Sequence, residues 1–205
     1  ICRNFIKSNA FGATKTLTCA AVSALQDVDF QDITLAGAAA PVSGTRIGDC
    51  KGNSGITFDT PKTVYWRNAT AASWGQANVW SSTIGGTGDT TQFPLAQDTA
   101  VFSSSYPNSG VTITMNAPYN VGSVDMSART ANTMTFSSGS TTTNPVIYGN
   151  WINGTGTSFT GTNAITFSGR SSQTITSAGV TFTQRIVTDT LTGSVTLQDA
   201  LNTNC

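Results

Sequence analysis

The segment Ala164–Thr183 reads AITFSGRSSQTITSAGVTFT, and three short runs in it alternate apolar residues with threonine. Successive side chains of a β-strand point to opposite faces, so each run predicts a short strand with one apolar face and one hydroxyl-covered face. Similar runs lie on both sides of this segment, at Val111–Met115, Val121–Met126, Thr133–Phe136, Val146–Tyr148, Arg185–Thr188 and Ser194–Leu197. This pattern predicts an all-β protein.

The amino-acid composition supports this fold class. The 205 residues include 36 Thr, 22 Ser, 20 Gly and 15 Asn, but no Glu and only four Lys. Strong helix formers are therefore scarce, and strand and turn formers dominate. Ten Phe and four Trp argue against a disordered chain, because disordered segments are poor in aromatic residues.

The charges and residue types exclude several function classes. Ten Asp balance four Lys and six Arg, and this zero net charge argues against a nucleic-acid partner. The chain has no His, which excludes Ser-His-Asp and Cys-His catalysis and any zinc or haem held by His. No apolar run approaches the about 20 residues that a membrane helix needs. We therefore expect no membrane span and no cofactor.

Two architectures fit an all-β chain with short strands. A β-sandwich would join antiparallel strands by tight turns, but the chain has a single Asn-Gly pair, Asn153-Gly154. A β-solenoid stacks parallel rungs in register, and rows of Thr and Ser can then follow each other on its outer faces. We favour the solenoid, with these side chains inward: Val111, Ile113, Val124, Met134, Phe136, Ile165, Phe167, Ile175 and Phe182.

Three regions follow from the residue pattern. Residues 1–60 form a β-rich segment at the end of a solenoid unit, residues 61–105 a Trp-rich insert or cap, and residues 106–205 Thr-rich rungs. Ser23–Phe30 and Val195–Asn202 share Leu-Gln-Asp followed by an apolar residue. With Ile at position 1 and Cys at position 205, this similarity leads us to expect a unit that recurs in a longer chain.

The carboxylates gather in one place. Asp27 and Asp29 alternate with Val28 and Phe30, so a strand would put both acids on one face. Such a pair can act as acid and base in glycoside hydrolysis, can bind Ca²⁺, or can form a solvated strand face. We expect no metal site beyond this weak calcium candidate.

The cysteines fit no metal motif, because their spacing lacks any C-x-x-C pair. In an oxidising setting Cys2 and Cys19 are the most plausible local disulfide. The alternative is that Cys19 serves as a small apolar residue of a strand, without any bond.

Large aromatic residues cluster at Tyr65, Trp66, Trp74 and Trp80. Exposed rings in this number would form a platform for stacking against the sugar rings of a glycan. Buried rings would instead form the core of a small capping subdomain, and tryptophan is highly buried on average. We expect Trp66 and Trp80 to lie inside such a subdomain.

This aromatic region carries a resemblance. Its pattern comprises the Tyr65-Trp66 pair, Trp74, Trp80-Ser81, a Gly85-Gly-Thr-Gly turn, Pro94 and Asp98–Phe102, followed by Thr-rich rungs. It resembles a module of phage tail-fibre-like structural proteins, and similar modules occur in autotransporter-type bacterial surface proteins. The resemblance covers most of residues 23–126 and departs at Arg67–Ser73, where that pattern has a Gly-rich turn.

The resemblance implies a structural or adhesive role outside the cell or on a virion, and it supplies no catalytic residues. It also implies a homo-oligomer or neighbouring repeats of one fibre, with contact to host-surface glycans. Our main hypothesis is a non-enzymatic fibre segment. The alternatives are a tailspike-type enzyme that cleaves glycans with the Asp27/Asp29 pair and a bacterial surface adhesin.

Overall fold

The computed structural model describes residues 1–115, 117–140 and 144–204. These residues form short strands and a single 3-10 turn, without any α-helix. The strands stack as a β-solenoid of about nine turns, and every strand pair is parallel except the pair of β6 with β8. The predicted β-solenoid is therefore confirmed, and the sandwich alternative is wrong. Among the described residues, no helix is long and apolar enough to cross a membrane.

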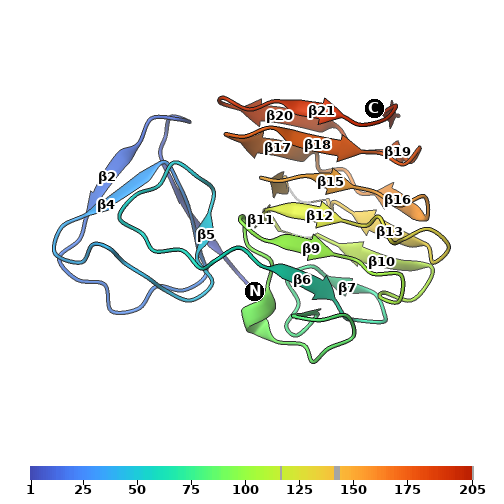
Figure 1. The fold of residues 1–205 in the computed structure, drawn as a ribbon, viewed down its shortest axis with the longest axis horizontal. Coiled ribbons are helices and arrows are strands. Elements are labelled where there is room, and N and C mark those ends of the chain that lie inside the picture. Colours follow the sequence, from blue (N-terminus) through green and yellow to red (C-terminus); the bar gives the residue numbers. More distant parts are fainter. Residues whose placement is uncertain (116, 141–143, 205) are drawn as a thin grey trace.

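The solenoid consists of two stacks, which we call the small stack (residues 1–58) and the large stack (residues 63–204). Figure 1 looks nearly along the axis of the small stack, on the left, and across the axis of the large stack, on the right. One sheet of the small stack contains β1 (Asn4–Lys7), β3 (Val28–Gln31) and β5 (Gly48–Asp49), and the other contains β2 (Lys15–Thr18) and β4 (Ile33–Ala36). Isolated bridges from Thr34 to Ser54 and from Val42 to Ile56 complete its third rung.

The large stack has three faces, each made of parallel strands. The first contains β6 (Thr63–Trp66), β9 (Thr99–Val101), β12 (Ser123–Asp125), β15 (Trp151–Ile152), β18 (Gln173–Thr176) and β21 (Val195–Leu197). The second contains β7 (Ala72–Ser73), β10 (Val111–Thr114), β13 (Met134–Ser137) and β16 (Thr157–Thr160), and is continued by the pair of β19 (Thr181–Phe182) and β22 (Asn202–Thr203). The third contains β11 (Asn120–Val121), β14 (Val146–Ile147), β17 (Ile165–Gly169) and β20 (Ile186–Thr190).

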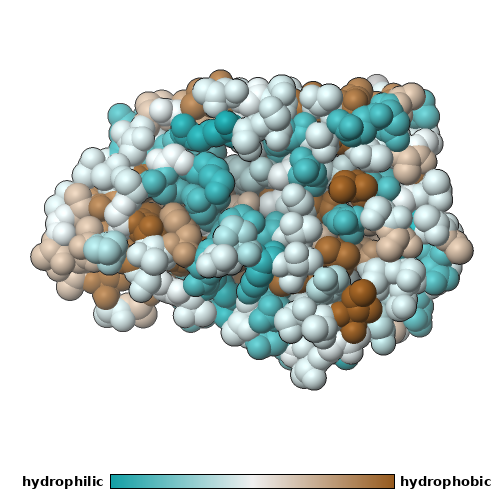
Figure 2. Space-filling model, viewed as in Figure 1, coloured by the Kyte–Doolittle hydropathy of each residue, from teal (hydrophilic) through white to brown (hydrophobic). Residues whose placement is uncertain are grey.

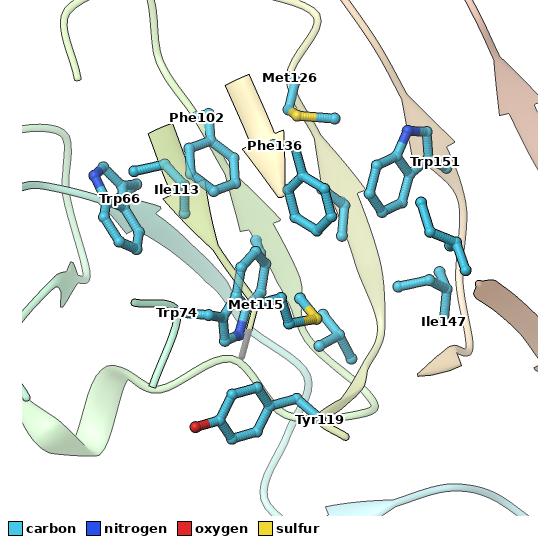
Figure 3. Close-up of a cluster of buried hydrophobic side chains, with 14 of the residues drawn as sticks. Trp66, Trp74, Phe102, Ile113, Met115, Tyr119, Met126, Phe136, Ile147 and Trp151 are labelled. Carbon is cyan, nitrogen blue, oxygen red and sulfur yellow. The ribbon is translucent and has the colours of Figure 1, made fainter. Parts of the chain in front are cut away.

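The alternation of apolar and hydroxyl residues determines which side chains enter the core. Because the strands pair in register, inward residues stack in columns, such as Ile113 on Phe136 and Phe136 on Phe159. Figure 3 shows the aromatic and aliphatic side chains of the large stack filling the space between its faces. Of the nine residues predicted to point inward, all are buried except Val111, which is half-buried.

Residues 61–105 supply the first strands of the large stack and also the cover over its end. β6, β7 and β9 pair with later rungs of the same sheets. Between them the chain forms β8 (Trp80–Ser81), which turns back on β6, and the 3-10 turn η1 (Thr90–Gln92). In Figure 1 this segment lies below β6, at the lower end of the stack. The Trp-rich region is thus continuous with the rungs that it covers.

Candidate functional site: the joint between the stacks

Two arginines hold the clustered carboxylates at the joint between the stacks. The Arg3 guanidinium donates to Asp29, with Nη2 2.5 Å from Oδ1 and Nε 3.1 Å from Oδ2. The Arg46 guanidinium donates to both oxygens of Asp27, at 2.6 and 2.7 Å. Arg3 Nη1 also lies 3.4 Å from Asp27 Oδ1, so the four side chains form one network. The Asp29 side chain is almost completely buried.

Consecutive rungs of the small stack bring these residues together. Arg3 precedes β1, Asp29 lies in β3, and Arg46 precedes β5, so the three lie on successive turns of one sheet. Asp27 has a positive φ of 55°, which turns the chain into β3. Gly48 leaves room for the Asp29 carboxylate, because a Cβ at position 48 would collide with it.

Polar side chains of the large stack complete the joint. Asn120, at the start of β11, donates from Nδ2 to Asp29 Oδ2 at 3.0 Å, and this bond is buried. Gln97 accepts from the backbone N–H of Asp49 and donates to the carbonyl of Ile47. Arg170 forms an ion pair with the buried Asp32. The small stack is therefore joined to the large one by directed hydrogen bonds and ion pairs.

A buried thiol lies beside this network. Cys50 packs against Ala96 and Tyr148, which belong to the large stack. Burial and the nearby Asp29 charge raise the pKa of the Cys50 thiol well above its ordinary value. Burial and the neighbouring Cys50 also raise the pKa of the Tyr148 hydroxyl. Both groups therefore stay neutral, which suits a packed contact and removes the thiolate that nucleophilic chemistry needs.

Asp27 and Asp29 both contact Arg3, but only Asp29 lies in β3, because Asp27 precedes this strand at a positive φ. The solvated strand face is wrong for Asp29, because its carboxylate is buried under Arg3 and Asn120. The arrangement gives no support to calcium binding, because Arg3 and Arg46 already pair with the two carboxylates. No group of three or more His, Cys, Asp or Glu residues in the described ranges is placed to hold a metal ion.

The lowered pKa of the Asp27 carboxyl predicts that the fold loses stability in acid. Burial raises the pKa of Asp27, but hydrogen bonds from Arg46 and Gln26 outweigh burial, and the pKa lies below its ordinary value. A lowered folded-state pKa stabilises the fold above the unfolded-state pKa, and this contribution is lost as pH falls through the folded-state pKa. We expect Asp27→Asn to lack a stabilising contribution of about 1 kcal/mol or less, which the wild type has above about pH 4 and loses as the pH falls further.

Urea unfolding of both proteins between about pH 6 and pH 3 checks this expectation. The stability difference between the wild type and Asp27→Asn should narrow as pH falls. A difference that stays constant over this range would contradict the assignment of Asp27 as a titrating partner of Arg46.

The clustered aromatic residues belong to the core and offer no platform for a glycan. Trp66, Trp74 and Trp80 are at most 2% exposed, and Tyr65 alone is half-buried. The Trp80 ring packs edge-on against Trp66 and Trp74, with centroids 5.2 and 4.7 Å away. The indole N–H of Trp80 donates to the carbonyl of Trp74. The glycan-stacking hypothesis for these residues is corrected, because only the Tyr65 ring retains appreciable exposed surface.

This burial predicts weak quenching of tryptophan fluorescence by iodide. Trp151 is also fully buried, so all four indoles are shielded from solvent. We expect quenching several-fold weaker than that of free N-acetyltryptophanamide, and equal to it once the chain is unfolded in urea. Equal quenching in the native protein would show that the rings are exposed.

The predicted Cys2–Cys19 disulfide is absent. Cys2 is exposed, Cys19 is half-buried, and both are free thiols, as is Cys50. Cys2 precedes β1 and Cys19 follows β2, so they lie at the two ends of one rung, beside strands of different sheets. Cys19 fits the alternative of a small unbonded residue. Cys205 lies outside the described residues.

A cleft of about 560 Å³ lies where the start of the chain passes the large stack. Its lining includes Cys2, Arg3, Gln76 and Tyr119. The Tyr119 hydroxyl donates to the carbonyl of Ile1, and Arg3 is engaged with Asp29. Two polar groups of this cleft, the Tyr119 hydroxyl and the Arg3 guanidinium, thus already bind within the protein.

Several residues of the joint escaped the sequence analysis. They are Arg3, Arg46, Gln97, Asn120, Tyr148 and Arg170. No spacing rule links them, because they come from separate rungs of both stacks. The one available signal was the scarcity of charge, since each Arg in such a chain is a candidate partner for the clustered Asp residues.

Comparisons with protein-family profiles, with curated proteins and with solved structures found no match for this chain.

Proposed function

We propose that this chain is a non-catalytic structural segment of an extracellular or virion fibre. The observation that carries the proposal is that both candidate carboxylates, Asp27 and Asp29, are held by side chains of the protein itself. Glycoside hydrolysis requires one protonated and one ionised carboxyl group, both within reach of the substrate. Asp29 is buried beneath Arg3 and Asn120, and Asp27 is held by Arg46. Neither group is free to approach a sugar.

Other carboxylates also serve the fold. Asp98 is buried and accepts from the backbone N–H groups of Leu95 and Lys62. Asp89 caps η1 by accepting from Thr91 N, and Asp199 accepts from the N–H of Ser177 on the preceding rung. Active sites gather acids and bases that are available for proton transfer, whereas these carboxylates fix turns and rungs. This use of charge supports a structural role.

The outer surface suits a fibre segment. The outward positions of the strands carry mainly hydroxyl groups, as in Thr112, Thr135 and Ser158, which occupy equivalent positions on consecutive rungs. The net charge of the chain is zero, so neighbouring molecules repel each other little. Together with the resemblance to tail-fibre modules, these properties favour assembly over catalysis.

A polysaccharide cleavage assay tests the proposal. The 205-residue chain is incubated with a panel of bacterial polysaccharides, and newly formed reducing ends are measured. We expect no release above the buffer blank. Release by the wild type that disappears in a folded Asp27→Asn/Asp29→Asn variant would replace the structural proposal with a glycan-cleaving enzyme. Circular dichroism of the double variant supplies the folding control.

A further inference from the structure

The second face of the large stack has a regular sequence repeat. The segments VTIT, MTFS, TSFT and VTFT begin at positions 111, 134, 157 and 180, so each begins 23 residues after the one before. β10, β13 and β16 pair in register. The rings of Phe159 and Phe182 stack with centroids 4.4 Å apart, which places β19 on the next rung. The repeat therefore gives four consecutive rungs with one arrangement of side chains.

Every outward position of these four rungs carries a hydroxyl group. The third residue of each segment is buried, whereas the second and fourth residues are half-buried or exposed. The outward residues form two columns, which we call the hydroxyl array: Thr112, Thr135, Ser158 and Thr181, and beside them Thr114, Ser137, Thr160 and Thr183. Within the first column, the hydroxyls of Thr135 and Ser158 hydrogen-bond at 2.9 Å. The array is thus ordered along both of its directions.

The richness of the chain in Thr and Ser does not by itself account for this array. Figure 2 shows that pale residues of intermediate hydropathy, the class of Thr and Ser, cover much of the large stack. On the first face, however, one outward column contains Val101, Asp125, Ile152 and Thr176, which mix apolar, acidic and hydroxyl side chains. The second face lies on the side of the large stack away from the small stack (Figure 1), so the joint does not cover it.

The hydroxyl array lacks the groups with which proteins bind other macromolecules. Its eight positions include no charged, amide or aromatic side chain. Protein interfaces are enriched in aromatic residues and Arg, which supply most of their binding energy. Nucleic acids require positive charge, and aromatic rings are the usual stacking surface for glycans. A surface of hydroxyl and methyl groups is suited instead to ordered water, which accepts and donates hydrogen bonds at both sides of an interface.

The spacing of the hydroxyl groups fits a crystalline arrangement of water. Adjacent strands lie about 4.8 Å apart, and alternate residues of one strand lie about 6.6 Å apart. On the prism faces of hexagonal ice, oxygen atoms repeat along two perpendicular directions at comparable spacings. Within the described residues, the hydroxyls of Thr112, Thr114 and Thr160 form no hydrogen bond to the protein, so they are free to bind water. Because the rungs fix these groups, little further ordering is needed when the array meets a crystal.

We propose that the hydroxyl array binds the surface of ice. This inference goes beyond the proposed fibre function and does not depend on it. The ligand is crystalline water, so no single hydroxyl recognises it, and binding depends on the regularity of the whole array. Protein molecules adsorbed at separate points force the ice between them to grow as curved fronts, and this curvature lowers the temperature at which growth continues.

Two double variants with the same chemical change on different faces test the proposal. The array variant is Thr135→Asp/Thr160→Asp, which places charges on adjacent rungs of the second face. The matched control is Thr176→Asp/Thr196→Asp, which does the same on the first face. Each pair joins one half-buried and one exposed position, and the two residues of each pair are diagonal neighbours. Circular dichroism and urea unfolding verify that both variants are folded.

Ice grown slowly on a cold probe in a solution of the 205-residue chain provides the measurement. The protein concentration in the ice is compared with that in the remaining liquid, and serum albumin serves as the excluded reference. We expect the wild type and the control variant to enter the ice and to leave a gap between the melting and freezing temperatures of a seed crystal. The array variant should enter the ice about tenfold less, because its carboxylates must lose their hydration at the crystal surface.

Four results would overturn the inference. The first is a wild type excluded from ice as completely as albumin, and the second is an array variant that enters ice as the wild type does. The third is a control variant excluded as strongly as the array variant, which would mean that added charge acts without regard to the face. The fourth is binding of the wild type to insoluble cellulose or chitin that the array variant alone loses, which would assign the array to a glycan. None of these results bears on the polysaccharide cleavage assay, which tests the proposed function separately.

Discussion

Phe167→Asp is expected to leave the chain largely unfolded. Phe167 is fully buried in β17, in register with the buried Ile147, and its ring contacts Trp151 with centroids 6.5 Å apart. Loss of a buried phenylalanine side chain costs about 3–5 kcal/mol by itself. An unpaired carboxylate in the same place costs several kcal/mol more, or is forced to take up a proton. The sum is comparable to the whole stability of an ordinary domain, about 5–15 kcal/mol.

Circular dichroism and urea unfolding measure this effect, and two further variants bracket it. Phe167→Ala should remain folded but lose about 3–5 kcal/mol of unfolding free energy. Thr160→Asp introduces the same charge at an exposed position of β16 and should change stability by about 0.5 kcal/mol or less. Equal effects of Phe167→Asp and Thr160→Asp would mean that Phe167 does not lie in the core.

The stacked rungs were predictable because their pattern is local. In Ile165-Thr-Phe167 and Thr174-Ile-Thr176, the parity of each residue assigns it to the inner or the outer face of a strand. The structure buries Ile165, Phe167 and Ile175 and leaves Thr174 half-exposed. A one-residue slip would turn the hydroxyl groups inward, so the burial of one face also fixes the register of the rungs.

The start of the large stack was harder to predict because its pairing spans a long loop. Thr63 in β6 pairs with Thr99 in β9, and no alternating run connects them. The Asp98 carboxylate accepts hydrogen bonds from the backbone N–H groups of Lys62 and Leu95, and these bonds hold the two ends of this loop together. Such contacts depend on three-dimensional proximity, which a strand pattern does not encode.

The partners of Asp27 and Asp29 could not be predicted from the sequence, because they lie on other rungs and on the other stack. The alternation around Val28 places Asp27 in the strand, whereas Asp27 precedes β3 at a positive φ. Arg3 reaches the two acids from the previous rung and Arg46 reaches Asp27 from the next. Asn120 comes from the other stack. In the sequence, Asp27 and Asp29 therefore resemble a pair of unpaired acids. In the structure, they form the ionic contacts of the joint between the stacks.

Asp29→Ala is expected to lower the free energy of unfolding by about 3–5 kcal/mol, because it leaves the Arg3 guanidinium buried without its main partner. The Arg3 side chain is only 4% exposed, and its remaining bonds run to the Arg46 carbonyl and, at 3.4 Å, to Asp27. Asn120 loses its acceptor in the same variant. Urea unfolding measures the loss, with the exposed Asp59→Ala as a control that should change stability by about 0.5 kcal/mol or less.

A double-mutant cycle separates the ion pair from the packing around it. Breaking a buried pair leaves an uncompensated charge, whereas replacing both partners by apolar residues of similar volume is often neutral. Arg3→Met/Asp29→Leu should therefore be more stable than either Arg3→Met or Asp29→Leu alone. Additive losses in the cycle would contradict the pairing, since residues that share no interaction add within about 0.5 kcal/mol. A non-additive result would assign the stability of the joint to the Arg3–Asp29 contact itself.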